Sequence, residues 1–337
     1  MLRIDGEEAL ANRKLNPRHS WNSGGSTAGL SGDPEDASHR IFGSFVQIRP
    51  SYGGPRLQLS DPVFAMGSCF AREIEAALAA AGGNIVSVDE RIDRPEFHDG
   101  QGRVRSTFFH RYTPRSMLQE FQQAFDEAPG WSDDALLFRQ ARGDAVSDLN
   151  YCSFAGADES ETAVRLRRRL ARELVRRAAQ AKLVILTLGL IEAWRHKPSG
   201  LYANAPAPAV LARKAKEFEL LQMDVEDTLG CLEQMHDLLR RRHETGAFQL
   251  VVTVSPVPMA ATFTRQDVVI ANAESKAVLR AAAAKFTAGR EGVHYFPSYE
   301  MVTYCAPDHA WRPDRLHVNG KVTRGIVKSF MRAYYRR

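Results

Sequence analysis

Cysteine is scarce in this sequence and is not arranged for cross-linking. The 337 residues include four cysteines, Cys69, Cys152, Cys231 and Cys305, which lie far apart and form no Cys-X-X-Cys pair. Disulfide frameworks and structural zinc sites both need paired or clustered ligands. We therefore expect neither a disulfide framework nor a bound metal.

Several other features that define a function class are also missing. No apolar stretch reaches the roughly 18 residues of a membrane span, and the first residues, MLRIDGEEALANRK, contain no apolar run resembling a signal peptide. Neither a P-loop nor a dinucleotide-binding glycine pattern occurs. A net charge of +5 is too small to imply nucleic acid by itself. We expect a cytoplasmic protein with no membrane span, no nucleic-acid partner and no tightly bound cofactor, and the oligomeric state stays open.

The composition is ordinary for a globular protein, with 44% hydrophobic and 25% charged residues. A chain of this length can bury a large core. Residues 1–56 include a stretch rich in glycine, serine, aspartate and proline, which predicts an irregular N-terminal arm. Residues 57–337 predict one domain with a proline-marked insertion at about 195–224.

Strand and helix patterns alternate within residues 57–337. Short apolar runs predict strands at 63–66, 84–88, 182–189, 248–255 and 293–299. Amphipathic patterns predict helices that begin near residues 70, 113, 161, 225, 271 and 320. Such alternation is typical of a parallel sheet with helices on both faces, an α/β/α sandwich. Ligands of these sheets bind beyond the carboxyl ends of the strands, so the turns after the strands are the first places to look for a site.

Ser68 and Cys69 lie on a tight turn between a predicted strand and a predicted helix. Gly67 precedes them and lets the backbone bend sharply. Unpaired N–H groups and the helix dipole favour negative charge at a helix N-terminus. A thiol or hydroxyl there is a candidate nucleophile because the helix end stabilises a thiolate or a developing oxyanion. The alternative is that small residues were needed for packing at the turn.

The segment WRPDRLHVNGKV places Asp314 three residues before His317, just ahead of the final predicted helix. An imidazole in this loop can take the proton from a nucleophile while the aspartate orients it. The alternative is a loop aspartate beside a solvated histidine. Finding a nucleophile turn at the other end of the domain favours the catalytic interpretation.

Several short blocks resemble the GSCFA domain family of the SGNH/GDSL hydrolase superfamily. Residues 67–71 read GSCFA, the sequence that names the family, and further blocks are SPVPM at 255–259, ESKAVLR at 274–280 and YFPSYEM at 295–301. The set Asp314, His317, Asn319 and Gly320 resembles the superfamily's final block. The resemblance covers roughly residues 57–335. It implies a flavodoxin-like α/β/α sandwich that hydrolyses or transfers acyl groups through a covalent intermediate.

Matched to the superfamily's Gly-Asp-Ser motif, Cys69 takes the position of the nucleophile and Ser68 that of the aspartate. The resemblance therefore implies Cys69 as nucleophile, with Ser68 as the alternative, His317 as base and Asp314 as its orienting partner. It implies small-molecule or glycan acyl donors and acceptors, and an acyl thioester is a possible donor. The rival interpretation is a non-catalytic binding or scaffold protein that kept the fold.

Residues 189–192 resemble the superfamily's Gly-X-Asn-Asp block, but Ile191 cannot supply the side-chain amide expected there for the oxyanion. The oxyanion hole would then use the backbone N–H of Cys69, at the turn that Gly67 opens, and the backbone N–H of Gly189. Glu192 is either a second acid in the site or a partner for Arg195.

Three other positions and one arginine-rich helix are weaker candidates. Trp194 flanks the same rim and either lines the pocket or belongs to the core. His110 and Tyr112 precede a helix and either contact an acyl acceptor or pack within a loop. The seven arginines from Arg165 to Arg177 are more typical of a solvated helix face than of a polyanion site.

Overall fold

The computed structural model describes most of the chain. The described residues are 4–23, 33–46, 48, 54, 56–89, 109–127, 131–132, 134–139, 145–151, 159–204, 211 and 213–336. Cys152 and the prolines at 206 and 208 lie outside them.

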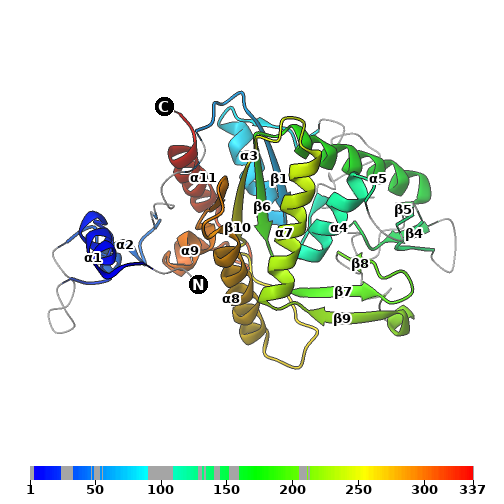
Figure 1. Ribbon diagram of the computed structural model, residues 1–337. Helices are drawn as coiled ribbons and strands as arrows, with labels where there is room; N and C mark the ends of the chain where they lie inside the picture. The colour runs from blue at the N-terminus through cyan, green and yellow to red at the C-terminus, as the bar shows by residue number, and fades with distance from the viewer. Residues whose placement is uncertain are drawn as a thin grey trace.

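A parallel sheet of five strands forms the centre of the domain (Figure 1). Its strands are β1 (Pro62–Gly67), β2 (Asn84–Ile85), β6 (Leu183–Leu188), β10 (Gln249–Val254) and β11 (Val293–Tyr295). They lie in the order β2-β1-β6-β10-β11, and every neighbouring pair is parallel. This is the flavodoxin-like order. The predicted α/β fold is confirmed.

Side chains of successive strand residues point to opposite faces of the sheet and so meet different helices. Val63 and Ala65 belong to one buried core, whereas Phe64 and Met66 belong to the other. The first core is closed by α3 (Cys69–Ala80), α9 (Ser298–Thr303) and α11 (Gly320–Tyr334). The second is closed by α4 (Pro114–Ala124), α5 (Glu161–Arg176), α7 (Val225–Arg242) and α8 (Val268–Thr287). The three-layer arrangement follows from this alternation (Figure 1).

Two predicted strands are shorter than expected. The strand expected over 293–299 ends at Tyr295, and Pro297 then precedes the first turn of α9. The strand expected over 84–88 ends at Ile85. Beyond it, the Ser87 hydroxyl accepts a hydrogen bond from the Ala65 N–H at 3.1 Å, in place of a strand carbonyl.

The N-terminal arm contains two helices, α1 (Gly6–Leu15) and α2 (Ala37–Arg40), where we expected irregular chain. The Asp5 carboxylate caps α1 by accepting from the Glu7 N–H at 2.8 Å, a strong local start signal. Farther along the arm, the Phe42 N–H donates to the Tyr304 carbonyl at 2.6 Å, which ties the arm to the domain.

The insertion, for which the sequence predicted no strands, forms a small antiparallel sheet. Its strands are β7 (Glu192–His196), β8 (Tyr202–Ala203) and β9 (Phe218–Gln222), with a 3₁₀ turn, η5 (Ala215–Glu217). A second antiparallel sheet contains β3 (Leu137–Arg139), β4 (Ala145–Asp148) and β5 (Glu159–Ser160). Outside these two sheets, the structure also contains a 3₁₀ turn, η4 (Arg177–Gln180), and a short helix, α10 (Pro307–Ala310).

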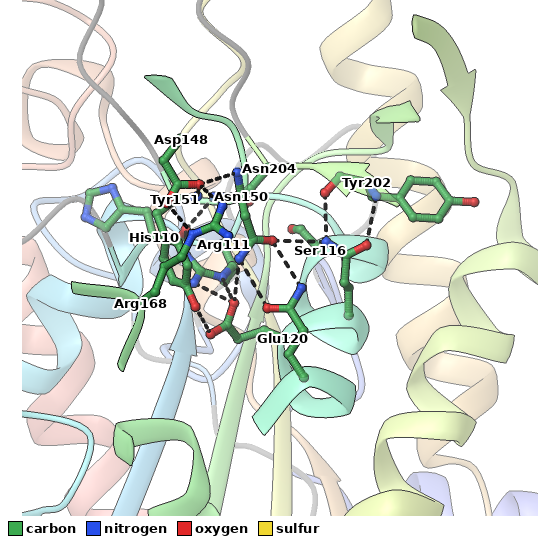
Figure 2. Close-up of polar contacts among 12 residues, drawn as sticks. His110, Arg111, Ser116, Glu120, Asp148, Asn150, Tyr151, Arg168, Tyr202 and Asn204 are labelled. Atoms are coloured by element: carbon green, nitrogen blue, oxygen red, sulfur yellow. Dashed lines mark hydrogen bonds and ion pairs between the residues drawn. The ribbon is translucent and has the colours of Figure 1, made fainter. Parts of the chain in front are cut away.

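A buried polar cluster lies between these small sheets and α4 (Figure 2). At its centre the Glu120 carboxylate pairs with Arg111 at 2.7 Å, and both side chains are only 1% exposed. The Tyr151 hydroxyl donates to Glu120 at 2.8 Å, and Arg168 pairs with Asp148 at 2.7 Å. Burial and the Glu120 charge raise the pKa of the Tyr151 hydroxyl well above its ordinary value. Each buried charge thus has a partner, as burial requires.

This cluster fixes the segment 110–112 across the carboxyl ends of β1 and β6. The Arg111 N–H donates to the Gly67 carbonyl at 2.8 Å, and the Tyr112 carbonyl accepts from the Leu190 N–H at 2.8 Å. The Asn204 side chain bonds the backbone of the same segment through the His110 carbonyl at 2.6 Å. The segment therefore links the two turns that carry the candidate site.

Replacing Gly67 by alanine is expected to destabilise the fold by about 1–3 kcal/mol, because the added methyl must push packed atoms apart. A Cβ at Gly67 would lie 2.6 Å from the Thr187 Cβ and carbonyl oxygen. Gly230→Ala in α7 is the matched control, since a Cβ there meets nothing within 4 Å; it should stabilise the helix by about 0.5–1 kcal/mol. Chemical denaturation measures both changes, and equal effects would contradict the close approach at Gly67.

Replacing Glu120 by glutamine should reduce the free energy of unfolding by about 3–5 kcal/mol, because it leaves the Arg111 charge buried without its carboxylate. Lys285→Met is the control, since Lys285 forms an exposed pair with Glu226 at 2.7 Å and such pairs contribute about 1 kcal/mol or less. Urea unfolding of the two variants tests this. Similar stabilities would show that the buried pair is not what holds the segment 110–112.

Candidate functional site

A cavity of about 390 Å³ lies at the carboxyl ends of β1, β6 and β10. The turns after all three strands contribute to its wall, as does the loop that precedes α11. The lining includes Ser68, Cys69, Tyr112, Gly189, Glu192, Trp194, Ser255 and His317. The topology therefore brings most of the residues singled out from the sequence to one place. Gly67, His110 and Asp314 do not line the cavity.

Ser68 and Cys69 occupy the first positions of α3. Ser68 is the N-cap residue and is 4% exposed, and its hydroxyl donates to the Ser255 hydroxyl at 3.3 Å. Cys69 is half-buried and lines the cavity. Burial, followed by the Glu73 charge, raises the pKa of the Cys69 thiol, although N–H groups of the helix end act in the opposite direction. In the resting protein, desolvation therefore outweighs the effect of the helix end on the Cys69 thiol.

His317 is held by Asp314 within one tight turn. The Asp314 carboxylate lies 2.8 Å from His317 Nδ1 through one oxygen, and its other oxygen accepts from the N–H groups of His317 and Leu316, both at 3.0 Å. Hydrogen bonds hold the pKa of Asp314 well below its usual range, and those from His317 have a larger effect than the one from Leu316. Since Nδ1 faces the carboxylate, Nε2 is the ring nitrogen left for proton transfer. Within the described residues, no hydrogen bond joins His317 to Ser68 or Cys69.

The loop that carries His317 is attached to α3 by a second set of contacts. Arg312 pairs with Glu73 of α3 at 2.8 Å, and the Arg312 N–H donates to the His317 carbonyl at 2.8 Å. The Thr323 hydroxyl of α11 also donates to Glu73, at 3.1 Å. Glu73 thus connects the helix that begins at Cys69 to both sides of the histidine loop.

Hydrogen bonds hold the backbone on both sides of Gly189, through the Leu188 carbonyl and the Leu190 N–H. The Leu188 carbonyl accepts from the Ser255 N–H of the neighbouring β10 edge at 2.8 Å. The peptide bond to Gly189 is trans, so the Gly189 N–H points the opposite way, toward the side of β1 and its turn. A Cβ at Gly189 would lie 2.6 Å from the Tyr112 carbonyl oxygen, which explains why glycine stands here.

Glu192 tethers the loop after β10. Its carboxylate accepts from the Phe263 N–H at 3.0 Å and from the Thr262 hydroxyl. The suggested pairing of Glu192 with Arg195 is wrong, because Arg195 pairs with Glu219 at 2.8 Å across β7 and β9. Trp194 lines the cavity and packs edge-on against the Phe263 ring, with 5.1 Å between the ring centres.

His110 and Tyr112 have different roles. Tyr112 lines the cavity, whereas His110 is buried behind it with Nδ1 3.2 Å from the Tyr112 hydroxyl. Burial, then the nearby Arg72 and Arg111 charges, lower the pKa of His110 to about 3. His110 therefore stays neutral and packs within the rim, as the packing alternative stated.

Sequence reasoning did not single out Lys276 and gave Ser255 no role, although Ser255 lies in the block 255–259 and Lys276 in the block 274–280. Lys276 is 1% exposed, and its ammonium donates to the carbonyls of Gly189 and Val257, each at 2.8 Å. A signal was present, because Lys276 falls on the same face of α8 as the buried Leu279 and Ala283. A lysine on an apolar stripe needs a buried partner.

Within the described ranges, no three His, Cys, Asp or Glu side chains cluster closely enough to bind a metal ion. None of the described helices combines the length and the apolar character needed to cross a bilayer.

Comparisons with known proteins place the chain in a family. No curated protein matches it. A solved structure that resembles it is described as a carbohydrate esterase family 3 from Talaromyces cellulolyticus, with 13% sequence identity and a TM-score of 0.33 over 80% of this chain and 94% of that one. The model of the GSCFA family matches residues 62–330. This range is most of the chain, and the chain belongs to the GSCFA family.

Proposed function

We propose that this protein is an SGNH-like acyl-ester hydrolase or acyltransferase that works through a covalent acyl-enzyme. The observation that carries the proposal is that Cys69 and His317 line one cavity while Asp314 holds the far nitrogen of the imidazole. A nucleophile, a base and an orienting acid are the components that acyl transfer requires.

In the proposed first step, His317 Nε2 takes the thiol proton as Cys69 Sγ attacks the acyl carbonyl carbon. A C–S bond forms, and the carbonyl π electrons move to the oxygen. The backbone N–H groups of Cys69 and Gly189 stabilise this oxyanion. When the oxyanion collapses, the bond to the leaving group breaks and His317 gives the proton to the departing oxygen or sulfur.

In the second step, an alcohol, an amine or water attacks the thioester formed on Cys69. His317 takes the proton of the attacking group and returns it to the Cys69 sulfur as the acyl group leaves. Asp314 stabilises the imidazolium in both steps. We propose a small-molecule or glycan donor and acceptor, with an acyl thioester as a possible donor, and a cytoplasmic enzyme without a tightly bound cofactor.

Exposure favours Cys69 over Ser68 as nucleophile. Ser68 is 4% exposed and its hydroxyl donates to Ser255, whereas Cys69 is half-buried. The raised pKa of the Cys69 thiol means that the proton must be removed during attack rather than beforehand. This requirement gives His317 its role as base.

A non-catalytic binding or scaffold protein remains the second candidate because of Ile191. This residue stands where the superfamily carries a side-chain amide, and it is 1% exposed within the core. The backbone N–H of Gly189 must replace that amide if the protein is an enzyme.

Replacing Cys69 by alanine should abolish labelling by p-nitrophenyl butanoate, read as an added butanoyl mass on the intact protein, because the attacking atom is gone. Cys231→Ala is the matched control. Cys231 is buried in α7, and burial raises the pKa of its thiol to about 11, so its loss should leave labelling unchanged. Labelling that survives in Cys69→Ala and stops in Ser68→Ala would assign the attack to Ser68.

Replacing Asp314 by asparagine should lower the labelling rate by about 100- to 10,000-fold, because the imidazole loses its orientation and the charge that stabilises imidazolium. Thermal unfolding should change little, since Asp314 is exposed on its loop. Asp308→Asn, at an exposed acid that pairs with Arg315, is the control and should label normally. A normal rate in Asp314→Asn would remove the acid from the mechanism.

A further inference from the structure

Lys276 is a buried side chain whose amino group bonds to carbonyl groups rather than to a carboxylate. Its side chain is 1% exposed, and Nζ donates to the Gly189 and Val257 carbonyls at 2.8 Å. The ion pairs of the described residues include none that involves Lys276. Burying a lysine in this way is costly, whereas an apolar side chain would fit the stripe that Lys276 shares with Leu279 and Ala283.

The two carbonyls belong to different turns of the cavity wall. Gly189 follows β6 and Val257 follows β10, and both residues line the cavity. Nζ is therefore a bridge between two turns. The segments after β6 and β10 are also joined by the Ser255 N–H bond to the Leu188 carbonyl and by Glu192, whose carboxylate accepts from Thr262 and Phe263. Lys276 reaches this point from α8, a helix that packs against β10 and β11.

The bridge acts on the peptide group that follows Gly189. Lys276 holds the carbonyl of the Gly189–Leu190 peptide, and the Tyr112 carbonyl holds its N–H at 2.8 Å. Ser255 holds the preceding peptide through the Leu188 carbonyl. With both flanking peptide planes fixed, the direction of the Gly189 N–H is fixed as well.

We propose that Lys276 is a positioning residue for the oxyanion hole, acting through the Gly189 carbonyl to keep the Gly189 N–H aimed at the developing oxyanion. This inference rests on the proposed function, because the oxyanion belongs to the acyl transfer step. Preorganised donors of this kind stabilise the transition state because they need no reorganisation during the reaction.

The bridge does not require a charged lysine. Burial lowers the pKa of Lys276 to about 7, and a thiolate at Cys69 acts in the opposite direction. An ammonium has three N–H donors and a neutral amine has two. Two donors are enough for the two carbonyls, so the Gly189 peptide stays fixed in either protonation state.

The test compares two reactions of Cys69 in the full-length protein. Alkylation by iodoacetamide displaces iodide and forms no oxyanion, whereas acylation by p-nitrophenyl butanoate forms one. In Lys276→Met, the acylation rate should fall about 10- to 100-fold, part of the effect of removing an oxyanion donor, while alkylation stays at the wild-type rate. Lys276→Gln, which keeps N–H donors but is shorter, should lose less of the acylation rate than Lys276→Met.

Lys285→Met on the exposed side of the same helix is the control, and it should leave both rates unchanged. A merely structural role would lower acylation and alkylation together, and that result overturns the proposal, as does normal acylation in Lys276→Met. If Lys276→Met does not fold, the test uses Lys276→Gln instead. A ratio of acylation rate to alkylation rate that equals the wild-type ratio then overturns the proposal. If the wild-type protein is alkylated but never acylated, the proposed function itself is overturned. If the wild-type protein is acylated at a rate that does not depend on Lys276, only the role of Lys276 is overturned.

Discussion

The candidate site depends on backbone hydrogen bonds at the carboxyl edge of the sheet. Gly67, at the end of β1, accepts from the Arg111 N–H, and the Leu188 carbonyl, at the end of β6, accepts from the Ser255 N–H after β10. Tyr112 completes the edge by accepting from the Leu190 N–H. These bonds join segments that are far apart in the chain, and they set the positions of the turn that carries Cys69 and of the Gly189 N–H.

Burial shifts the electrostatics of this edge in a consistent direction. It raises the pKa of the Cys69 thiol and lowers the pKa values of His110 and Lys276, each toward the neutral form. Asp314 is the contrasting case, because its exposed carboxylate accepts three hydrogen bonds and stays ionised. Burial therefore favours the neutral forms of these three groups, while Asp314 keeps a negative charge beside the imidazole.

Local patterns predicted the framework well, because strand and helix periodicity and the glycine at Gly67 are properties of neighbouring residues. Sequence reasoning singled out Cys69 and His317 from the chemistry of a nucleophile and a base and from the resemblance to the GSCFA family, and both residues line one cavity. It could not find the role of Glu192 or Lys276, since Thr262, Phe263 and Val257 become their partners only after the chain has folded. The strands of the insertion were not predicted for a similar reason: β7, β8 and β9 pair with one another rather than with the main sheet.

The pairing of Arg312 with Glu73 also ties the position of His317 to α3, the helix that begins at Cys69. Asn319 both caps α11 and donates its N–H to the Ala310 carbonyl, so the histidine loop and the start of α11 are ordered together. The position of His317 relative to Cys69 therefore depends on the docking of α11 against α3 as well as on the sheet.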